Sequence, residues 1–463
     1  MAMVSMGRRS VLRGSLGLAA AGPLSMPYIA RAEATTATMW QTQGFVPAED
    51  EAIRKVVADY QKASGNKLDL TITPFMALMQ KTVSALTAGE VPDVVSMDAP
   101  DTLLSQNAWD DKLVDVSDVV ETQKSTLNSS ALLYSYVYNN ATKKRAYYFV
   151  PYKMNSIPFH VWGSLVEKAG YKLSDAPKTW DAFWDFFKPM QAKLRAKGMR
   201  RVYALGLQLT SVGPNDGNGV FYGFLIANGG QDIVTADGKL HTDDPKVRQA
   251  AIKSIAYMTQ ALKDGYVPPE VLSWSDSDDN NAYHEKLMVM DFDGTISTEL
   301  ALYSNKELYL KEMVTLGLPL GNDGKPVPAQ VGAGGGFIPK GAKNVAVAKD
   351  FLKYILQPKV QSEYLKNGLG RWVTTAPGMV KEDPWWLDPS DPHRAPYVTE
   401  TLLGPTIPVY NAYNPAWGRV AAEQLWGQAA AAVVKDGATP EAAVDKAFKR
   451  AEAIFKQYPI TVS

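Results

Sequence analysis

The sequence of 463 residues has a formal net charge of zero, with 46% hydrophobic and 21% charged residues. This is the composition of an ordinary globular protein, and the zero net charge removes the electrostatic case for binding nucleic acid or an anionic membrane. Because the sequence has no cysteine, a disulfide framework, a cysteine-ligated cluster and a lipid-anchoring cysteine are excluded.

Residues 1–34 are organised like a signal peptide. Arg8 and Arg9 precede a weakly apolar run at 14–24, and Ala30-Arg31-Ala32 forms a small-x-small cleavage pattern. The run is too short to span a bilayer, which needs about 20 apolar residues, and this arrangement is typical of export signals. The paired arginines favour the twin-arginine route. We expect a mature protein that is soluble in the periplasm and not lipid-anchored; a cytosolic protein with a basic amphipathic leader is the alternative.

The remaining chain of about 430 residues exceeds what one hydrophobic core usually serves, so two domains are expected. Its first part alternates between the residue spacing typical of strands and that typical of helices. Strand candidates lie at 38–41, 67–73 and 93–97, and apolar residues at helical spacing mark 49–60 and 78–86 between them. This order predicts an α/β fold with a parallel sheet and crossover helices.

Later elements follow from turn and cap signals. We expect a strand at 147–150, a helix capped by Thr179, and a loop at 273–281 before a strand at 288–290. The stretch 417–455 predicts helices interrupted at an Asp-Gly pair.

Ligands of open α/β sheets bind beyond the carboxyl ends of the strands. This rule makes the loops at 41–45 and 98–101 candidate ligand contacts. For Asp98 and Asp101, capping of the helix before Leu103 is an equally good interpretation.

Several segments, in this order, resemble the family-1 extracellular solute-binding proteins, the maltose-binding-protein-like receptors of ABC sugar importers. They are 86–95 (LTAGEVPDVV), 228–238 (from NGG to DG), 264–269 (DGYVPP), 337–341 (FIPKG) and the helix 348–356 with an Ala-x-x-Phe-Leu pattern. The resemblance spans nearly the whole mature chain. It implies a fold like that of type II periplasmic binding proteins, with two α/β lobes joined by a three-segment hinge.

The resemblance also implies domain boundaries. Lobe one would contain 35–150 and 295–332, and lobe two would contain 151–294 and 333–463. The three crossing segments are expected at 150–155, 291–295 and 332–336. The glycines of the third segment suit a hinge, because Gly absorbs large backbone changes at low cost. A plain surface turn is the alternative for them.

The implied function is that of a binding protein without catalysis. It would bind a sugar or oligosaccharide in the interlobe cleft and deliver it to the membrane subunits of an ABC permease. We expect a monomer with no cofactor, no metal and no nucleic-acid partner. The four scattered histidines argue against a metal.

Sugar sites combine aromatic faces with carboxylates, amides and arginine, because buried polar partners discriminate between analogues. The family contact regions, carried over to this sequence, give the expected ligand-binding residues Gln43, Phe45, Asp98, Asn155, Asp216, Asn218, Trp274, Asp293, Gly294, Gly335, Arg371, Trp372, Tyr410 and Trp417. At Asn155 a family member has a sugar-contacting carboxylate, so the amide is a departure. For each tryptophan the alternative is a core position, and for each aspartate a helix cap.

One motif favours a different class of protein, a periplasmic hydrolase. Asp291-Phe292-Asp293-Gly294-Thr295 follows an apolar strand, as in the nucleophile motif of haloacid-dehalogenase-type phosphatases. It lies far along the chain, however, and no suitable acidic pair for magnesium follows it. A Gly-x-Ser-x-Gly elbow is absent, and a glycosidase carboxylate pair has no positive signal. We therefore expect no catalytic residue.

Overall fold

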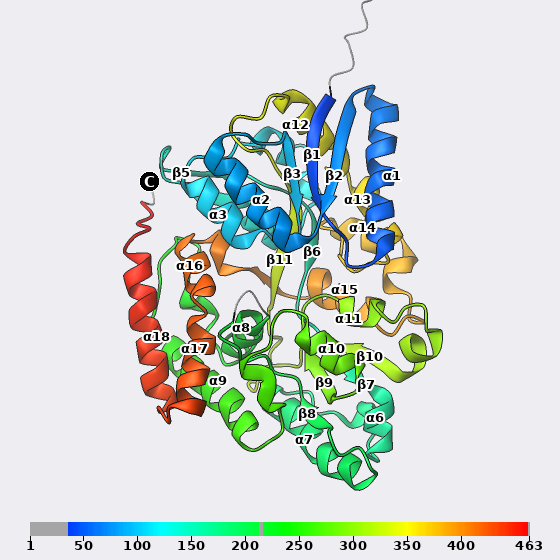
Figure 1. Cartoon of the computed structure of the whole chain (residues 1–463), viewed down its shortest axis with the longest axis vertical. Helices are drawn as coiled ribbons and strands as arrows, with labels where there is room; N and C mark the ends of the chain where they lie inside the picture. The colour runs from blue at the N-terminus through cyan, green and yellow to red at the C-terminus, as the bar shows by residue number, and fades with distance from the viewer. Residues whose placement is uncertain (1–35, 213–215, 462–463) are drawn as a thin grey trace, which may run out of the picture. The chain divides into compact units, whose positions relative to one another are not determined.

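Two large β-sheets and a two-stranded hairpin, with helices packed around them, form the part of the chain that the computed structural model describes, residues 36–212 and 216–461 (Figure 1). These residues belong to one unit, Thr35–Ser463. The predicted α/β class is confirmed. The predicted twin-arginine leader and its cleavage site lie outside the described residues. Among the described helices, none combines the length and the apolar character needed to cross a membrane.

The first sheet has six strands. Their bounds are Thr36–Thr42 (β1), Lys67–Thr73 (β2), Val94–Met97 (β3), Val150–Asn155 (β6), Ala329–Phe337 (β11) and Thr406–Pro408 (β12). Five of them lie in the order β12, β11, β3, β1, β2, and β6 also pairs with β11. β1 is parallel to β2 and β3, as predicted, whereas β11 is antiparallel to β3 and β6.

Helices and one hairpin accompany the first sheet. They are α1 (Pro47–Ser64), α2 (Phe75–Ala88), α3 (Asp101–Trp109), α4 (Ser117–Val120), α5 (Ser129–Ser135), β4 (Tyr136–Asn139), β5 (Lys144–Tyr147), α12 (Val345–Leu356), α13 (Pro358–Asn367) and α14 (Pro377–Glu382). In α1 the apolar residues at helical spacing are buried, and Gly65 ends the helix in the left-handed conformation. The first turn of α1 thereby places Glu49 beside the carboxyl end of β1.

The second sheet has the order β10 (Met313–Leu316), β7 (Phe159–Trp162), β9 (Met288–Phe292), β8 (Tyr203–Leu205). β7 and β9 are buried along their whole length, and Phe159 stacks on Phe292 with ring centroids 4.5 Å apart. The helices α6 (Gly163–Lys168), α7 (Trp180–Ala196), α8 (Gly217–Ala227), α9 (Pro245–Lys263), α10 (Asp278–His284), α11 (Ser297–Leu300), α15 (Arg394–Val398), α16 (Ala416–Ala422), α17 (Leu425–Lys435) and α18 (Pro440–Phe455) complete the fold.

Three local predictions differ from the structure. The strand predicted at 147–150 is wrong, because β5 ends at Tyr147 and β6 begins at Val150; between them the Tyr148 N–H bonds to Ser135 O outside either strand. Thr179 holds the N-cap position of α7, but its side chain accepts no hydrogen bond from that helix. The loop predicted at 273–281 is shorter, because α10 begins at Asp278.

Strand pairing and helix packing also depart from the predicted domain boundaries. β10 lies in the range 295–332 that was expected in lobe one, yet it pairs antiparallel with β7 of the second sheet. α12 and α13 lie in the range 333–463 that was expected in lobe two, yet they pack against α1 and β6 of the first sheet. Periodicity along the chain predicts a strand or a helix, but not which sheet it joins.

Two of the expected crossing segments, β6 and β11, pair with each other. Their antiparallel register joins Gly332 to Asn155 and Gly336 to Val150, with a bulge between Gly334 and Gly335. The glycine run is therefore a strand, and the alternative of a surface turn is wrong. A Cβ at Gly335 would lie 2.1 Å from Val150 O, so the backbones approach as closely as only glycine allows.

Replacement of this glycine tests the close approach. We expect Gly335→Ala to lower the free energy of unfolding by roughly 1–3 kcal/mol, the cost typical of overpacking, because the clash is with rigid backbone. Urea denaturation followed by circular dichroism measures the change. Gly378→Ala is the control, because a Cβ at this position in α14 meets nothing within 4 Å. Equal midpoints for the two variants would contradict the argument.

Candidate functional site

A cleft of about 550 Å³ is lined by loops from both sheets. Its first wall, on segments that pack with the first sheet, comprises Thr42, Gln43, Gly44, Phe45, Pro74, Phe75, Asp98, Ala99, Arg371 and Trp372. Its second wall, on segments that pack with the second sheet, comprises Asp216, Asp276, Asn280, Asp293, Gly294, Thr295 and Ser297. Asn155, the last residue of β6, also lines it.

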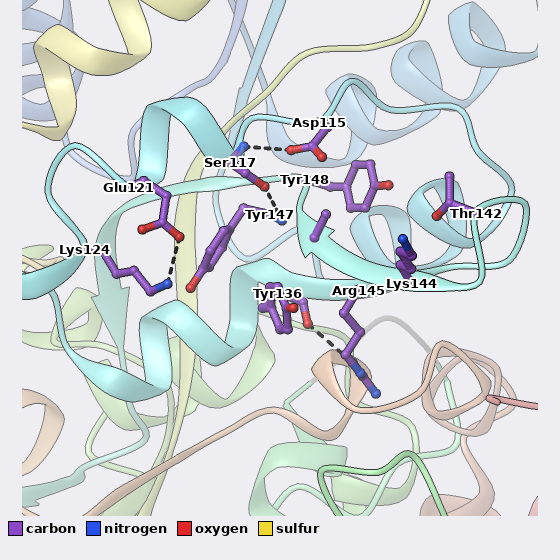
Figure 2. A pocket seen from close by; sticks show the side chains of 11 residues that line it. Asp115, Ser117, Glu121, Lys124, Tyr136, Thr142, Lys144, Arg145, Tyr147 and Tyr148 are labelled. Atoms are coloured by element: carbon purple, nitrogen blue, oxygen red, sulfur yellow. Dashed lines mark hydrogen bonds and ion pairs between the residues drawn. The ribbon is translucent and has the colours of Figure 1, made fainter. Parts of the chain in front are cut away.

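A larger hollow, of about 810 Å³, lies on the β4–β5 hairpin (Figure 2). Its lining residues all fall between 115 and 148, so only the β4–β5 hairpin and the segments next to it contribute to it. Its polar groups largely satisfy one another: Lys124 pairs with Glu121 at 2.7 Å, and Arg145 donates to Tyr136 O at 3.3 Å. We therefore take the cleft, where both sheets supply side chains, as the candidate site.

The charges on and behind the first wall are paired. The Arg371 Nε donates to Glu49 Oε2 at 2.9 Å, and its Nη2 donates to Asp98 Oδ2 at 2.8 Å. The Lys153 ammonium contacts the other oxygen of Asp98. Burial acts to raise the pKa of Asp98, but the charges of Lys153 and Arg371 outweigh it and lower that pKa. Two carboxylates and two cations thus neutralise each other here.

Aromatic rings flank this charge network. Phe45 leaves 47% of its surface exposed on the cleft, and the Arg371 guanidinium lies 5.9 Å from its ring centroid. Trp372 is buried, with the Lys153 ammonium 4.9 Å from its ring centroid. Of the two rings, Phe45 presents an apolar face to a solute.

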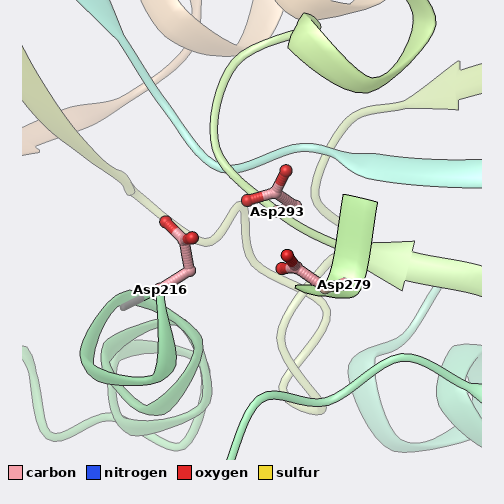
Figure 3. A group of neighbouring side chains, drawn as sticks. All are labelled: Asp216, Asp279 and Asp293. Atoms are coloured by element: carbon pink, nitrogen blue, oxygen red, sulfur yellow. The ribbon is translucent and has the colours of Figure 1, made fainter. Parts of the chain in front are cut away.

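The second wall is acidic. Asp293 follows β9, and its Oδ2 accepts a hydrogen bond from Asn280 Nδ2 at 2.8 Å. Asp216 occupies the N-cap position of α8, and Asp279 lies in α10 behind the wall, fully buried. The carboxylates of Asp216, Asp279 and Asp293 point toward one another (Figure 3). Within residues 36–212 and 216–461, no lysine or arginine forms an ion pair with any of these three.

This crowding raises the pKa values of the carboxyl groups. Burial, followed by repulsion from Asp293, raises the pKa values of Asp216 and Asp279 well above their usual range. Burial, then the charge of Asp293, raises the pKa of Asp291 to about 7. The carboxyl groups of the second wall therefore resist carrying several negative charges together, because no lysine or arginine of the described residues is paired with them.

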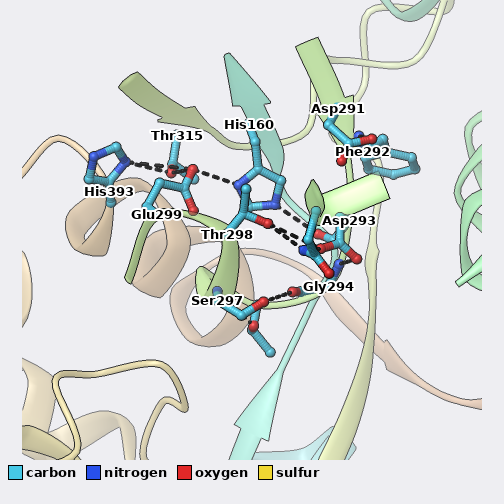
Figure 4. A network of polar contacts seen from close by, with 12 residues as sticks. His160, Asp291, Phe292, Asp293, Gly294, Ser297, Thr298, Glu299, Thr315 and His393 are labelled. Carbon is cyan, nitrogen blue, oxygen red and sulfur yellow. Dashed lines mark hydrogen bonds and ion pairs between the residues drawn. The ribbon is translucent and has the colours of Figure 1, made fainter. Parts of the chain in front are cut away.

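A buried polar network connects the second wall to the second sheet (Figure 4). His160 Nδ1 lies 2.6 Å from Glu299 Oε1, and its Nε2 lies 3.1 Å from Asp293 O. Thr315 Oγ1 donates to Glu299 Oε1 at 2.8 Å and contacts His393 Nδ1 at 2.9 Å. The His160 ring thereby holds the backbone that carries Asp293.

The charged forms of His160 and Glu299 stabilise each other and shift both pKa values. Burial acts to lower the pKa of His160, but the Glu299 carboxylate outweighs it and raises that pKa to about 9. Burial acts to raise the pKa of Glu299, and the charge of His160 overcomes it and lowers that pKa to about 2. The pair is therefore ionised at neutral pH.

The structure brings most of the predicted ligand-binding residues to the cleft. Those that line it are Gln43, Phe45, Asp98, Asn155, Asp216, Asp293, Gly294, Arg371 and Trp372. Whether they bind a ligand stays a prediction. Of the two alternatives for Asp98 and Asp101, Asp98 is in the ion-pair network rather than capping a helix, and Asp101 accepts from Tyr134 Oη at 2.6 Å.

The other predicted residues are not among those that line the cleft. Asn218 donates to Ala421 O at 3.2 Å, and Gly335 is enclosed by β6. Trp274 is buried in the core. Tyr410 and Trp417 are buried together, with ring centroids 5.1 Å apart. For both tryptophans the structure agrees with the alternative of a core position.

Sequence reasoning missed other cleft residues, chiefly Phe75, Asp276, Asn280, Thr295 and Ser297. Asp276 and Asn280 belong to the polar run 273–281, whose density of carboxylates and amides was a usable signal. Thr295 has a φ of 62°, a left-handed conformation that no local sequence pattern indicated.

The comparison with protein families decides the class. The family described as bacterial extracellular solute-binding protein matches residues 55–396. The chain belongs to this family. The resemblance found from the sequence is thereby confirmed at the level of the family, and so is the expectation of a binding protein rather than an enzyme. No curated protein matches the chain by sequence.

Solved structures agree in fold. An ABC transporter solute-binding protein from Thermotoga lettingae TMO, bound with alpha-D-tagatose, has a TM-score of 0.69 at 20% identity, covering 91% of this chain and 100% of that chain. Maltose-bound MalE3 of T. maritima has a TM-score of 0.70 at 19% identity, with coverages of 91% and 100%. A sugar transporter from Arthrobacter chlorophenolicus A6 with bound laminaribiose has a TM-score of 0.69 at 17% identity, with coverages of 91% and 99%.

The hydrolase alternative is not supported. Asp291, the nucleophile of the phosphatase interpretation, is 1% exposed, and its Oδ1 accepts the Phe292 N–H at 3.0 Å. Its side chain packs against Gly206 rather than lining the cleft. A nucleophile must reach its substrate, and membership in a family of solute-binding proteins accounts for the cleft without one.

The His160–Glu299 pair predicts a pH-dependent stability. The pKa of His160 rises from an ordinary 6.5 to about 9, so its contribution is complete below 6.5 and is lost as the pH rises through 9. The pKa of Glu299 falls from 4.5 to about 2, so its contribution is complete above 4.5 and is lost as the pH falls through 2. The free energy of unfolding that this pair contributes is therefore largest between pH 4.5 and 6.5.

Glu299→Gln breaks the pair. We expect it to lower the free energy of unfolding at pH 6 by roughly 3 kcal/mol, the cost of leaving a buried partner uncompensated, and to flatten the decline toward pH 9. Denaturant titrations across pH measure both effects. Glu363→Gln is the control, because it removes the same charge from an exposed pair with Lys55. Parallel pH profiles for the variant and the wild type would refute the assignment.

Proposed function

We propose that this protein is the periplasmic solute receptor of an ABC importer and that it binds a sugar or another polyhydroxy compound in the cleft. The observation that carries the proposal is a cleft with walls on two different sheets, in a chain of the solute-binding family. Structural neighbours with bound tagatose, maltose and laminaribiose support the choice of solute.

The polar groups of the cleft favour a solute that donates hydrogen bonds. The second-wall carboxylates are acceptors, and Asn155 Oδ1 is buried without a partner. The cations Lys153 and Arg371 are already engaged by Asp98 and Glu49. Hydroxyl groups fit such a surface, whereas a phosphate or carboxylate solute would add negative charge to a wall whose carboxyl groups already raise one another's pKa values.

The proposed contacts are the predicted residues that line the cleft. Phe45 would stack on the apolar face of a sugar ring, while Asp216, Asp293 and Asn155 would accept its hydroxyl protons. Gly294 would let the solute approach the backbone after β9. Arg371 and Asp98 would then hold the first wall in shape.

Transport follows from closure of two lobes. The first lobe carries the first sheet with α12 and α13, and the second carries the second sheet, including β10. β6 and β11 would form the hinge together with residues 291–295. A solute that contacts both walls selects the closed form through its higher affinity for it. The closed receptor, a monomer exported by the twin-arginine route and free in the periplasm, would dock on its permease.

Calorimetric titration of the purified protein with mono- and disaccharides tests the proposal. We expect saturable binding of at least one neutral sugar and no binding of sugar phosphates or glucuronate. A decrease in the radius of gyration on binding, measured by X-ray scattering, would accompany lobe closure. Binding of anionic solutes alone would reject the assignment to polyhydroxy compounds.

The aromatic contact has its own test. We expect Phe45→Ala to weaken binding of the sugar found in that panel about tenfold, equivalent to about 1.4 kcal/mol, because the variant removes the exposed ring face. Leu310→Ala is the control: Leu310 is 45% exposed, similar to Phe45, and does not line the cleft. Equal affinity of the two variants would remove Phe45 from the site.

A further inference from the structure

The two walls of the cleft differ in charge balance. On the first wall, Asp98 and Glu49 are matched by Lys153 and Arg371. On and behind the second wall lie Asp216, Asp276, Asp279, Asp291 and Asp293, and no lysine or arginine of the described residues forms an ion pair with them. Hydroxyl donors can satisfy such oxygens but bring no positive charge.

Three of these aspartates converge on one point. Asp216, Asp279 and Asp293 each place one carboxylate oxygen within 4.8 Å of the others (Figure 3). They come from the start of α8, from α10 and from the end of β9. Calcium binds oxygen ligands at about 2.3–2.6 Å, so two ligands of one ion lie at most about 5 Å apart. The spacing of the three oxygens fits a single ion.

A neutral side chain gives independent support for a ligand. Gln208 is 2% exposed, and its Nε2 donates to Asp279 Oδ2 at 2.6 Å. Its Oε1 is buried and has no hydrogen-bond partner. Since Nε2 of the same amide group bonds to Asp279, this oxygen lies close to the Asp279 carboxylate. Buried carbonyl oxygens are paired in nearly all native structures, and amide oxygens are ordinary calcium ligands.

We propose that Asp216, Asp279 and Asp293, with Gln208 Oε1, bind a hard divalent cation, Ca²⁺, at the second wall of the cleft. An all-oxygen site suits Ca²⁺ rather than a transition metal. Ca²⁺ also accepts irregular coordination, whereas Mg²⁺ demands a near-ideal octahedron. Asp279 is fully buried and does not line the cleft, so a small ion reaches all three carboxylates more readily than the ammonium group of a bulky solute.

Asp216 and Asp293 also line the cleft, so the ion lies next to the solute. It offers remaining coordination positions to hydroxyl oxygens and offsets the negative charge of the wall. Solute affinity should then depend on Ca²⁺. This last step rests on the proposed function, whereas the cation site itself does not.

Calcium binding is measured first, without any solute. Purified protein treated with EDTA and dialysed is titrated with CaCl₂ by calorimetry, and its melting temperature is recorded with and without Ca²⁺. We expect one Ca²⁺ per chain and a raised melting temperature. The proposal is overturned if millimolar Ca²⁺ produces no binding heat and no shift in melting temperature.

Variants locate the ion. We expect Asp279→Asn to weaken Ca²⁺ binding at least about tenfold, because a charged ligand is lost. Asp278→Asn is the matched control: it removes the same charge from the same helix, but its carboxylate bonds to Ser275 instead. Asp216→Asn, at an N-cap position without a side-chain capping bond, repeats the test should Asp279→Asn fail to fold. Equal losses in the ligand and control variants would show diffuse attraction and overturn the site.

The solute panel separates the two proposals. Each sugar is titrated in EDTA and in Ca²⁺, and we expect tighter binding in Ca²⁺. If Ca²⁺ binds but no sugar does, the proposed solute fails while the cation site stands. If Ca²⁺ does not bind and glucosamine binds more tightly than glucose, the carboxylates serve a solute ammonium group and the cation proposal is wrong.

Discussion

The close antiparallel pairing of β6 with β11 is the constraint on which the first wall depends. Gly334 lies opposite Lys153, and a Cβ on this glycine would come within 2.5 Å of the lysine side chain. The missing side chain leaves the space in which Lys153 runs to Asp98. The same strand pairing sets Asn155 at the end of β6, in the cleft. A larger residue in this run would thus disturb both the pairing of β6 with β11 and the charge pairing of the site.

The two walls are held in place by different interactions. The first wall is rigid because Arg371 joins the start of α1 to the loop after β3 through charge-assisted bonds at 2.8 and 2.9 Å. The second wall depends on the buried pair of His160 and Glu299, which holds the backbone at Asp293. Repulsion among the carboxylates opposes its assembly, so this inner pair offsets part of the cost of keeping the acidic groups together.

Much of the fold could be predicted from sequence because its signals are local. α1 and the three parallel strands of the first sheet follow from periodicity within single segments, and Gly65 marks where α1 ends. The sheet that β10 joins could not be predicted, because that choice depends on residues more than a hundred positions away. Some residues of the site could likewise be predicted from local sequence, and others could not. Asp98 and Asp293 follow buried strands, where ligand contacts are expected, whereas Asp279 gains its meaning only beside Asp216 in three dimensions.

The aromatic residues show a second limit of prediction from sequence. Residue type and family position predict that Trp417 and Tyr410 contact the ligand, yet the two rings pack into one buried cluster. Phe45, with no stronger local signal, is the ring that the structure leaves open on the cleft. Aromatic residues serve cores and sugar platforms with the same chemistry, so burial alone separates the two uses.

Electrostatics connects the cleft to lobe closure. If the lobes closed on an empty site, the second-wall carboxylates would lose water without gaining donors, and that loss costs free energy. A solute rich in hydroxyl groups, or a bound cation, replaces the lost solvation and removes the cost. In the proposed receptor, the acidic wall would therefore favour the open form when the cleft is empty and the closed form when it is filled. Such a difference is the differential affinity that the proposed receptor would need in order to signal occupancy to a permease.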